Sequence, residues 1–236
     1  MSGARLFHLH VPKTAGTSLR GAFHSAKYKV APVNSNFVYD PAQHAEVDLF
    51  SGHAGFRAVE ASPEFHGKVV TILRDPYDRV VSYYYHLVKQ RRDGREDSHR
   101  TNLAAKYSLV DFLAIKDDPH LLSDLYNAVT WQLAHDSDIH ARMAYRRREP
   151  AFSDADLVER AKANLSSCLV VGFQSRLDVF LDKLRQATGF AVQLRAENAN
   201  PERAALESVD AETRRRIRGW IELDVEVYEW ALATLG

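Results

Sequence analysis

The chain has one cysteine, Cys168, no long apolar run and no excess of either charge. A single cysteine excludes a disulfide framework and a cysteine-rich metal site, and the apolar run CLVVGF around it favours a small buried side chain. No segment has the length of a transmembrane helix, and no signal-peptide pattern opens the sequence. We therefore expect a cytoplasmic protein with no membrane partner.

The charges are balanced, with 31 Lys and Arg residues against 31 Asp and Glu residues. A protein that binds nucleic acid in bulk is more basic, so we expect no nucleic-acid partner. No cluster of carboxylates or of His and Cys has the spacing of a metal site, so we expect no metal requirement. The 236 residues, 45% of them hydrophobic, are enough for one substantial core, and we expect residues 1–236 to form a single domain.

Short apolar segments alternate with helical patterns along the chain. Segments without polar alternation are typical of strands covered on both faces, and they occupy residues 6–11, 69–73 and 169–172, with weaker candidates at 37–39 and 47–51. Apolar residues recur at helical spacing after Thr17, a candidate N-cap, and after Asp75, which can also cap a helix because Pro76 fits the first helical turn. Further helices are expected at residues 109–115, 121–134, 154–165, 177–187 and 210–235. This alternation predicts an α/β fold.

The segment LFHLHVPKTAGTSLRGAF, residues 6–23, joins the first expected strand to a helix through a loop that suits an anion. The first N–H groups of a helix have no intrahelical partner, and the helix dipole adds positive character there. Lys13 supplies a full charge, Gly16 allows close backbone approach, and hydroxyls come from Thr14, Thr17 and Ser18. The lysine precedes the glycine, unlike the order G-x-x-x-x-G-K-[ST]. The alternative is an ordinary strand-to-helix turn.

A second segment, VVTILRDPYDRVVSYYYHL, places Arg74 at the end of a strand and Ser82 about two turns into the next helix. Ligands of open α/β sheets bind at the carboxyl ends of the strands, so both segments deliver cationic and hydroxyl groups to one edge. Arg74 and Ser82 can share one phosphate. The alternative is that Arg74 and Arg79 form ion pairs with Asp75 and Asp78 near the helix terminus.

The two segments together resemble sulfotransferases that use 3′-phosphoadenosine 5′-phosphosulfate (PAPS), and most closely the heparan and chondroitin 2-O-type carbohydrate sulfotransferases. PKTAGTSLR is similar to the family's 5′-phosphosulfate loop, and RDPYDRVVSYY to its 3′-phosphate motif. The resemblance implies a P-loop-like three-layer α/β fold with a central, mainly parallel sheet flanked by helices. It also implies PAPS as co-substrate, bound by Lys13, Thr14, Ala15, Gly16, Thr17, Ser18, Arg74 and Ser82.

Weaker similarities extend over nearly the whole chain. FSGHAGF resembles the stretch whose histidine is the catalytic base, here His53, and YNAVTWQLAH resembles a family helix except that His135 replaces glycine. VVGFQSRLDVFLDKL has Ser175 in place of an acidic residue, and RAENANP has Asn200 in place of a hydroxyl residue. IELDVEVYEWA matches the closing D-x-x-[LV]-Y helix, in which Asp224 interrupts an apolar stripe and can accept a hydrogen bond.

Transfer of a sulfonate in line to an acceptor hydroxyl depends on positioning and on stabilisation of the leaving phosphate oxygen, a task for Lys13. The acceptor needs a base, and histidine suits that task. His53 stands in a turn between Gly52 and Gly55, where functional side chains are common. Structural or surface roles are expected for the histidines of the first strand and of the second motif's helix, His8, His10 and His86.

The acceptor is expected to be a carbohydrate or a small molecule with a hydroxyl group. Basic residues in the polar segment 89–106 either contact an anionic acceptor or belong to a solvated surface, which is the usual interpretation; they are Arg91, Arg92, Arg95 and Arg100. Residues 146–148 and 214–218 carry the same ambiguity. Two further functions stay open, a nucleotide phosphotransferase and a non-catalytic nucleotide-binding module, although the first is disfavoured because no G-K-[ST] places a hydroxyl on magnesium.

Overall fold

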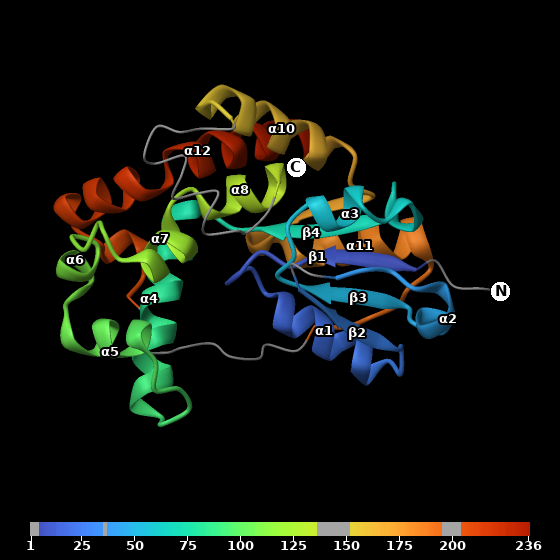
Figure 1. Ribbon diagram of the computed structural model, residues 1–236, viewed down its shortest axis with the longest axis horizontal. Helices are drawn as coiled ribbons and strands as arrows, with labels where there is room; N and C mark the ends of the chain where they lie inside the picture. The colour runs from blue at the N-terminus through green and yellow to red at the C-terminus, as the bar shows by residue number, and fades with distance from the viewer. Residues whose placement is uncertain (1–4, 35–36, 136–151, 195–203) are drawn as a thin grey trace.

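The computed structural model describes residues 5–34, 37–135, 152–194 and 204–236 (Figure 1). Its centre is a five-stranded sheet in the order β2-β3-β1-β4-β5, and every strand pairing is parallel. The strands are β1 (Leu6–Leu9), β2 (Val30–Val33), β3 (Leu49–Gly52), β4 (Val69–Leu73) and β5 (Val170–Phe173). The expected α/β class with a parallel central sheet is confirmed.

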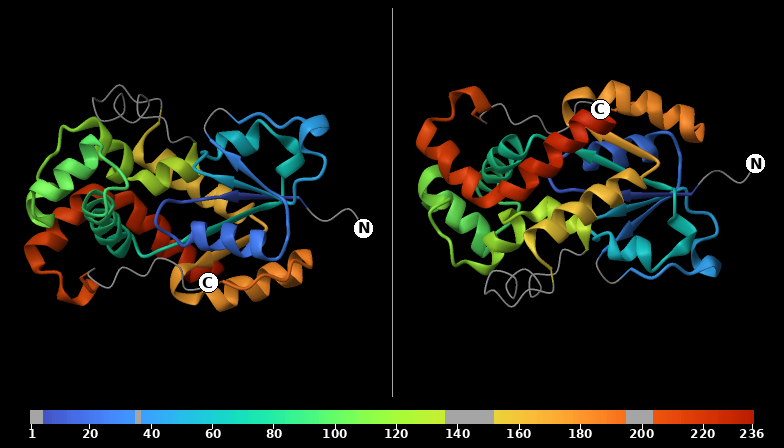
Figure 2. Two further views of the ribbon diagram at one scale, coloured as in Figure 1. Left: turned by 90° about the horizontal axis from the view of Figure 1, so that it is seen from below. Right: turned by 90° about the horizontal axis from the view of Figure 1, so that it is seen from above.

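Helices cover both faces of this sheet, as the two edge-on views show (Figure 2). One face packs against α1 (Gly16–Ser25) and α11 (Leu177–Thr188). The other face packs against α3 (Arg57–Glu60), α8 (Ala128–Ala134), α10 (Asp154–Ser166) and the C-terminal part of α12 (Ala211–Leu235). Alternation along β1 divides its residues between the layers, because Leu6 joins the α1 core whereas Phe7 and Leu9 join the opposite core. The fold therefore has three layers.

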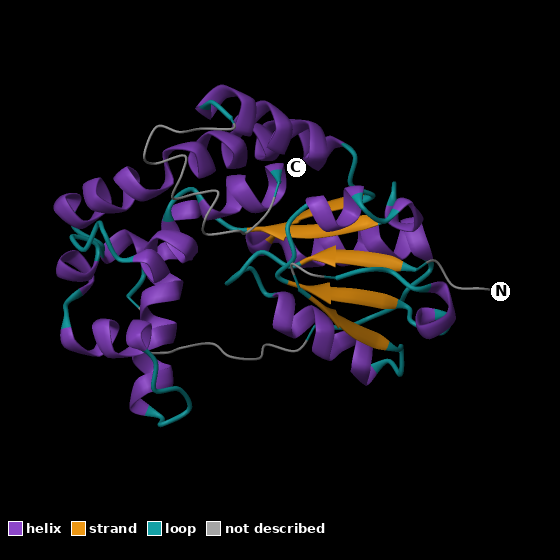
Figure 3. Ribbon diagram, viewed as in Figure 1, coloured by secondary structure: helices purple, strands orange, loops and turns teal. Residues whose placement is uncertain are grey.

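A second group of helices lies beyond the carboxyl ends of the strands, toward which every strand arrow points (Figure 3). It contains α4 (Pro76–Arg92), α5 (His99–Lys106), α6 (Leu109–Phe112) and α7 (Pro119–Leu125), packed with the N-terminal part of α12 around a separate apolar cluster. Short elements complete the chain at α2 (Pro41–His44) and the 3-10 turns η1 (Pro63–Phe65), η2 (Gln174–Arg176) and η3 (Leu206–Ser208). The carboxyl ends of the strands thus face the helices α4 to α7.

Two strand predictions differ from the structure. β2 is not among the expected strands, because Pro32 interrupts its sequence VAPV; a proline is tolerated there since β2 is an edge strand of the sheet. Residues 37–39 form no strand. Phe37 and Tyr39 instead pack their rings against Phe50 and Phe65, so the apolar pattern reflects a loop that contributes to the core.

Two helix predictions also need correction. The helix expected over residues 121–134 is divided into α7 and α8 by Asn127, whose backbone is left-handed with φ 44°. Thr17 is not an N-cap, because α1 already begins at Gly16 and follows Ala15. Asp75 does cap α4, since its carboxylate accepts a hydrogen bond from the Asp78 N–H at 2.9 Å.

The polar segment 89–106 is mostly helical, since it contains the end of α4 and all of α5. Cys168 is only partly buried; its thiol lies 3.4 Å from the Asn164 carbonyl, and loss of solvation raises its pKa to about 12. In the ranges that the structure describes, no helix combines the length and the apolarity needed to cross a bilayer. Cytoplasmic location stays a prediction.

Candidate functional site

The loop after β1 has an unusual backbone. Lys13 and Ala15 both adopt the left-handed conformation, with φ 71°, which is strained for residues other than glycine and is concentrated at functional sites. Left-handed residues that alternate with right-handed ones gather successive N–H groups into an anion-binding concavity. No side chain caps the start of α1. The local geometry therefore suits an anion at the first turn of α1.

Glycine is needed at position 16 because the ring of His10 leaves no room for a Cβ atom, as well as for its place in the loop. A Cβ atom at this position would lie 1.9 Å from His10 Cδ2, so the buried ring of His10 lies directly on the first turn of α1. Thr14 is also buried, and its hydroxyl donates to the Val11 carbonyl at 2.8 Å. The Thr14 hydroxyl proton is thus directed at the Val11 carbonyl, and a role of Thr14 in binding an anion stays a prediction. Thr17 is exposed and Ser18 half-buried.

Arg74 joins the two sequence motifs. Its Nη1 donates to the Lys13 carbonyl at 2.9 Å and to Ser82 Oγ at 3.0 Å. Its Nε donates to Asp78 Oδ2 at 2.6 Å, so the ion pair considered as an alternative is present beside the Ser82 contact. Burial lowers the pKa of Arg74 to about 10, at which the guanidinium is still charged at neutral pH. The loop and α4 thus meet at one cation.

Arg79 lies elsewhere, and the alternative that it pairs with Asp75 or Asp78 is wrong. The side chain is 1% exposed, and its Nη1 donates to the Asp124 carbonyl at 3.2 Å. Its Nη2 lies 3.7 Å from Asp224 Oδ2. Arg74 precedes the N-cap of α4, whereas Arg79 lies within the helix and approaches Asp224 of α12.

His53 follows β3 and stands against the end of β1. Its Nδ1 lies 2.9 Å from the His10 carbonyl, and the two imidazole rings have centroids 4.3 Å apart. Because a carbonyl can only accept, Nδ1 carries the proton in this contact, and Nε2 is the nitrogen able to accept one. His53 is exposed, whereas His8 and His10 behind it are buried.

The structural roles expected for His8 and His10 are confirmed. His8 Nδ1 is 2.8 Å from Ser51 Oγ, and its ring stacks on that of His10 at 5.2 Å. Burial is the main reason that the pKa values fall to about 3 for His8 and about 2 for His10, so both rings are neutral at physiological pH. His86 lies on α4 four residues after Ser82 and is partly buried; burial and then the charge of Lys13 lower its pKa to about 4.

Two of the weaker motifs contact each other. The Thr130 N–H and hydroxyl both donate to Asp224 Oδ1 at 2.8 Å, which confirms that Asp224 accepts hydrogen bonds in the core. Asn127 accepts from the Leu223 N–H at 3.0 Å and donates from its own N–H to the Trp220 carbonyl at 2.8 Å. The two motifs therefore hold α8 against α12 through hydrogen bonds.

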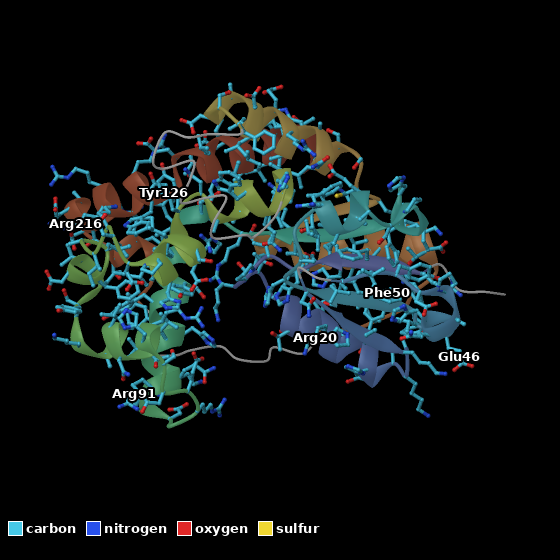
Figure 4. The ribbon with its side chains drawn as sticks, in the orientation of Figure 1. Arg20, Glu46, Phe50, Arg91, Tyr126 and Arg216 are labelled. Atoms are coloured by element: carbon cyan, nitrogen blue, oxygen red, sulfur yellow. The ribbon has the colours of Figure 1, made fainter. Side chains whose placement is uncertain are left out.

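The basic segments agree with a solvated surface. The arginines of residues 89–106 have acidic neighbours, in the pairs Arg91–Asp97, Arg92–Asp93, Arg95–Asp93 and Arg100–Asp124. Arg91 lies at the far end of α4 and Arg216, paired with Glu212, at the outer edge of α12 (Figure 4). Residues 146–148 and Asn200 lie outside the described residues.

An open pocket of about 470 Å³ adjoins the start of α4. Its lining includes Asp75 and Asp78 of the second motif and, from the segment after β5, Gln174 and Ser175. Among residues 5–34, 37–135, 152–194 and 204–236, no three His, Cys, Asp or Glu side chains form a group that could hold a metal ion. Sequence reasoning missed one buried polar residue at the site, Gln132, because no motif marks it.

A protein-family model described as the sulfotransferase family matches residues 3–231. A search of curated proteins found no significant match. Since the family model spans almost the whole sequence, the chain belongs to the sulfotransferase family.

Proposed function

We propose that this member of the sulfotransferase family transfers the sulfonate of PAPS to a hydroxyl of a carbohydrate or small molecule, with His53 as base. The observation that carries the proposal is the position of Arg74, whose Nη1 bonds to both Lys13 of the first motif and Ser82 of the second. One cation therefore connects the two groups of residues that a doubly charged adenosine nucleotide needs.

The donor is bound at its two phosphate ends. The uncapped start of α1 and the left-handed residues Lys13 and Ala15 support binding of the 5′-phosphosulfate through the N–H groups of residues 14–18. Arg74 and Ser82 bind the 3′-phosphate, with arginine as a planar donor and serine as a short one. The nucleoside extends toward the pocket that Gln174 and Ser175 line.

The reaction is an in-line displacement at sulfur. The acceptor oxygen forms the new S–O bond, the bond from sulfur to the 5′-phosphate oxygen breaks, and the acceptor proton passes to His53 Nε2. The electron pair of the broken bond stays on the phosphate oxygen, where Lys13 and the loop N–H groups stabilise it. The Nδ1–H contact with the His10 carbonyl supports this role, because it leaves Nε2 in the form that accepts a proton.

Calorimetry separates this function from a nucleotide phosphotransferase. The desulfated nucleotide 3′-phosphoadenosine 5′-phosphate is expected to bind with the same affinity with and without magnesium, and more tightly than ADP or ATP. Tighter binding of ATP that depends on magnesium would instead support the phosphotransferase.

Label transfer from PAPS to a panel of hydroxyl acceptors separates an enzyme from a non-catalytic binding module. His53→Ala is expected to bind the desulfated nucleotide as the unchanged protein does and to lose at least 100-fold in turnover, since general bases contribute about 10²- to 10⁴-fold. His66→Ala is the matched control, because His66 is an exposed histidine that precedes β4 at the opposite end of the strands. Normal turnover in His53→Ala would remove the base assignment.

A further inference from the structure

Gln132 is a buried amide at the junction of the loop, the His53 turn and α8. It is 3% exposed, and its Nε2 donates to the His10 carbonyl at 3.1 Å and to the Ala54 carbonyl at 2.9 Å. These two acceptors belong to the segment after β1 and to the turn after β3. One side chain therefore ties the segment after β1 to the turn that contains His53.

We infer that Gln132 is a positioning residue for the proposed base, fixing the His10 carbonyl and the His53 turn so that His53 keeps its proton on Nδ1. The inference rests on the proposed function, in which His53 Nε2 receives the acceptor proton. Gln132 acts through His53 and touches neither the donor nor the acceptor.

The hydrogen bonds leave the Gln132 amide one orientation. Both protons of its NH₂ group are directed at carbonyl oxygens. Rotation of the amide by 180° would set Oε1 against the same two oxygens, which cannot donate. The His10 carbonyl has two lone pairs, and the donors that share it are Gln132 Nε2 and His53 Nδ1. The position of that oxygen, and with it the ring orientation of His53, thus depends on α8.

α8 is itself held at several points. The Phe56 N–H donates to the Gln132 carbonyl at 2.9 Å, and the Arg57 N–H donates to the His135 carbonyl at 2.7 Å, so the chain that follows His53 is bound to the same helix. Two residues before Gln132, Thr130 is bonded to Asp224 of α12. The contact between α8 and α12 therefore has a functional consequence, because it sets where the amide of Gln132 lies.

Gln132→Met tests the inference, because methionine keeps the length of the side chain and removes both donors. Thr71→Val is the matched control: the Thr71 hydroxyl is buried and donates to the Leu9 carbonyl at 2.9 Å, one residue from His10, in a hydrogen bond that does not involve His53. We expect Gln132→Met to lower kcat about 10- to 100-fold, since small displacements of reacting groups have effects of this size. The Kd of the desulfated nucleotide is expected to stay within about twofold, and Thr71→Val to change neither quantity.

A direct measurement uses protein labelled with ¹⁵N in its histidine rings. The His53 signal of the unchanged protein, assigned by its loss in His53→Ala, is expected to show the Nδ1–H tautomer, and that of Gln132→Met a mixture of tautomers. Wild-type kcat with an unchanged ring signal would overturn the inference, as would a fall in kcat without any change in the ring signal. If Gln132→Met does not fold, Gln132→Asn, one methylene shorter, is expected to give a smaller change of the same kind.

The proposed function can fail separately. Should His53→Ala keep full turnover, His53 is not the base, yet the ring signal of Gln132→Met still decides whether Gln132 controls the His53 tautomer. A changed signal would then support the positioning role, and an unchanged one would refute it.

Discussion

Gly16 shows how a single position can serve two neighbours. On its outer side it belongs to the first turn of α1, where an anion is proposed to bind, and on its inner side it lies against the ring of His10. The sequence suggested only the first of these functions. The second was hidden because residues six apart in a strand–loop–helix segment meet only once the loop has its left-handed backbone.

Gly16→Ala is expected to destabilise the protein by about 1 to 3 kcal/mol, because the new methyl group would overlap the buried ring of His10. The midpoint of urea unfolding measures this change. Gly219→Ala is the control: a Cβ there meets only Lys116 Nζ at 3.8 Å, so alanine within α12 is expected to stabilise by roughly 0.5 to 1 kcal/mol. Equal stability of the two variants would show that the His10 ring moves aside to make room for the new methyl group.

Arg74→Lys is expected to weaken binding of the desulfated nucleotide at least tenfold, because an ammonium cannot reproduce contacts with Lys13, Ser82 and Asp78 together. Calorimetry with ADP supplies the comparison, since ADP lacks the 3′-phosphate and should lose little affinity. Arg92→Lys, on an exposed arginine at the last residue of α4, is the control. An equal loss for both nucleotides would place the 3′-phosphate away from Arg74.

The meeting of Lys13, Arg74 and Ser82 could be predicted because each follows a strand, and parallel strands deliver their ends to one edge. Gln132 could not be predicted in this way. Its only sequence signal is a polar residue within the apolar run TWQLA, and its two carbonyl partners belong to the backbone, which carries no sequence pattern.

At the scale of elements, α4 separates two uses of arginine. Arg74 faces the loop, whereas Arg79 faces α12 and approaches Asp224 within the core. Their common motif suggested a common role. Arg74 precedes the N-cap of α4, whereas Arg79 lies within the first turns of the helix, where the packing of α12 supplies its partner Asp224.

Asp224→Ala is expected to lower the free energy of unfolding by about 3 to 5 kcal/mol, because it leaves Arg79 charged and buried without its partner. Arg79→Met combined with Asp224→Ala should recover the part of that loss that comes from the unpaired guanidinium, but not the part that comes from the Thr130 N–H and hydroxyl, which lose their acceptor. Urea unfolding of the single and double variants gives the coupling energy. Additive losses would mean that the two side chains do not interact.

Apolar runs identified β1 and β4 in the interior of the sheet and β5 at one edge, but they missed β2 at the other edge. An edge strand such as β2 needs neither full burial nor every backbone donor, so Pro32 is accepted and the usual signal is missing. The break at Asn127 was equally hidden, because the apolar residues on both sides of it continue a helical spacing.

At the scale of the whole molecule, the buried histidines couple folding to pH. The pKa values of His8 and His10 in the folded protein, about 3 and about 2, lie below the usual 6.5 of an unfolded chain. Between these pKa values the unfolded chain binds more protons than the folded protein. The stability that comes from the two neutral rings is therefore fully present above pH 6.5 and is lost as the pH falls. Each ring is expected to remove roughly 1 kcal/mol of stability per pH unit below that point.

Urea unfolding from pH 7 to pH 4.5 measures this dependence, and His8→Asn is expected to reduce its slope because one of the two rings is gone. A slope that His8→Asn leaves unchanged would contradict the prediction. The same curves test the expectation of one domain over residues 1–236, for which a single cooperative transition is predicted at each pH.

The break in α12 has a mechanical consequence. Ile221 leaves helical geometry with φ −134°, and the neighbouring Leu223 N–H and Trp220 carbonyl are both bonded to Asn127. Because both sides of this break are bonded to Asn127, we expect α12 to be rigid at this point and not to act as a hinge. The C-terminal part of α12 packs on the sheet, and its N-terminal part packs on α4 to α7. The space where acceptor and donor are proposed to meet is therefore expected to keep its width as substrates enter and leave.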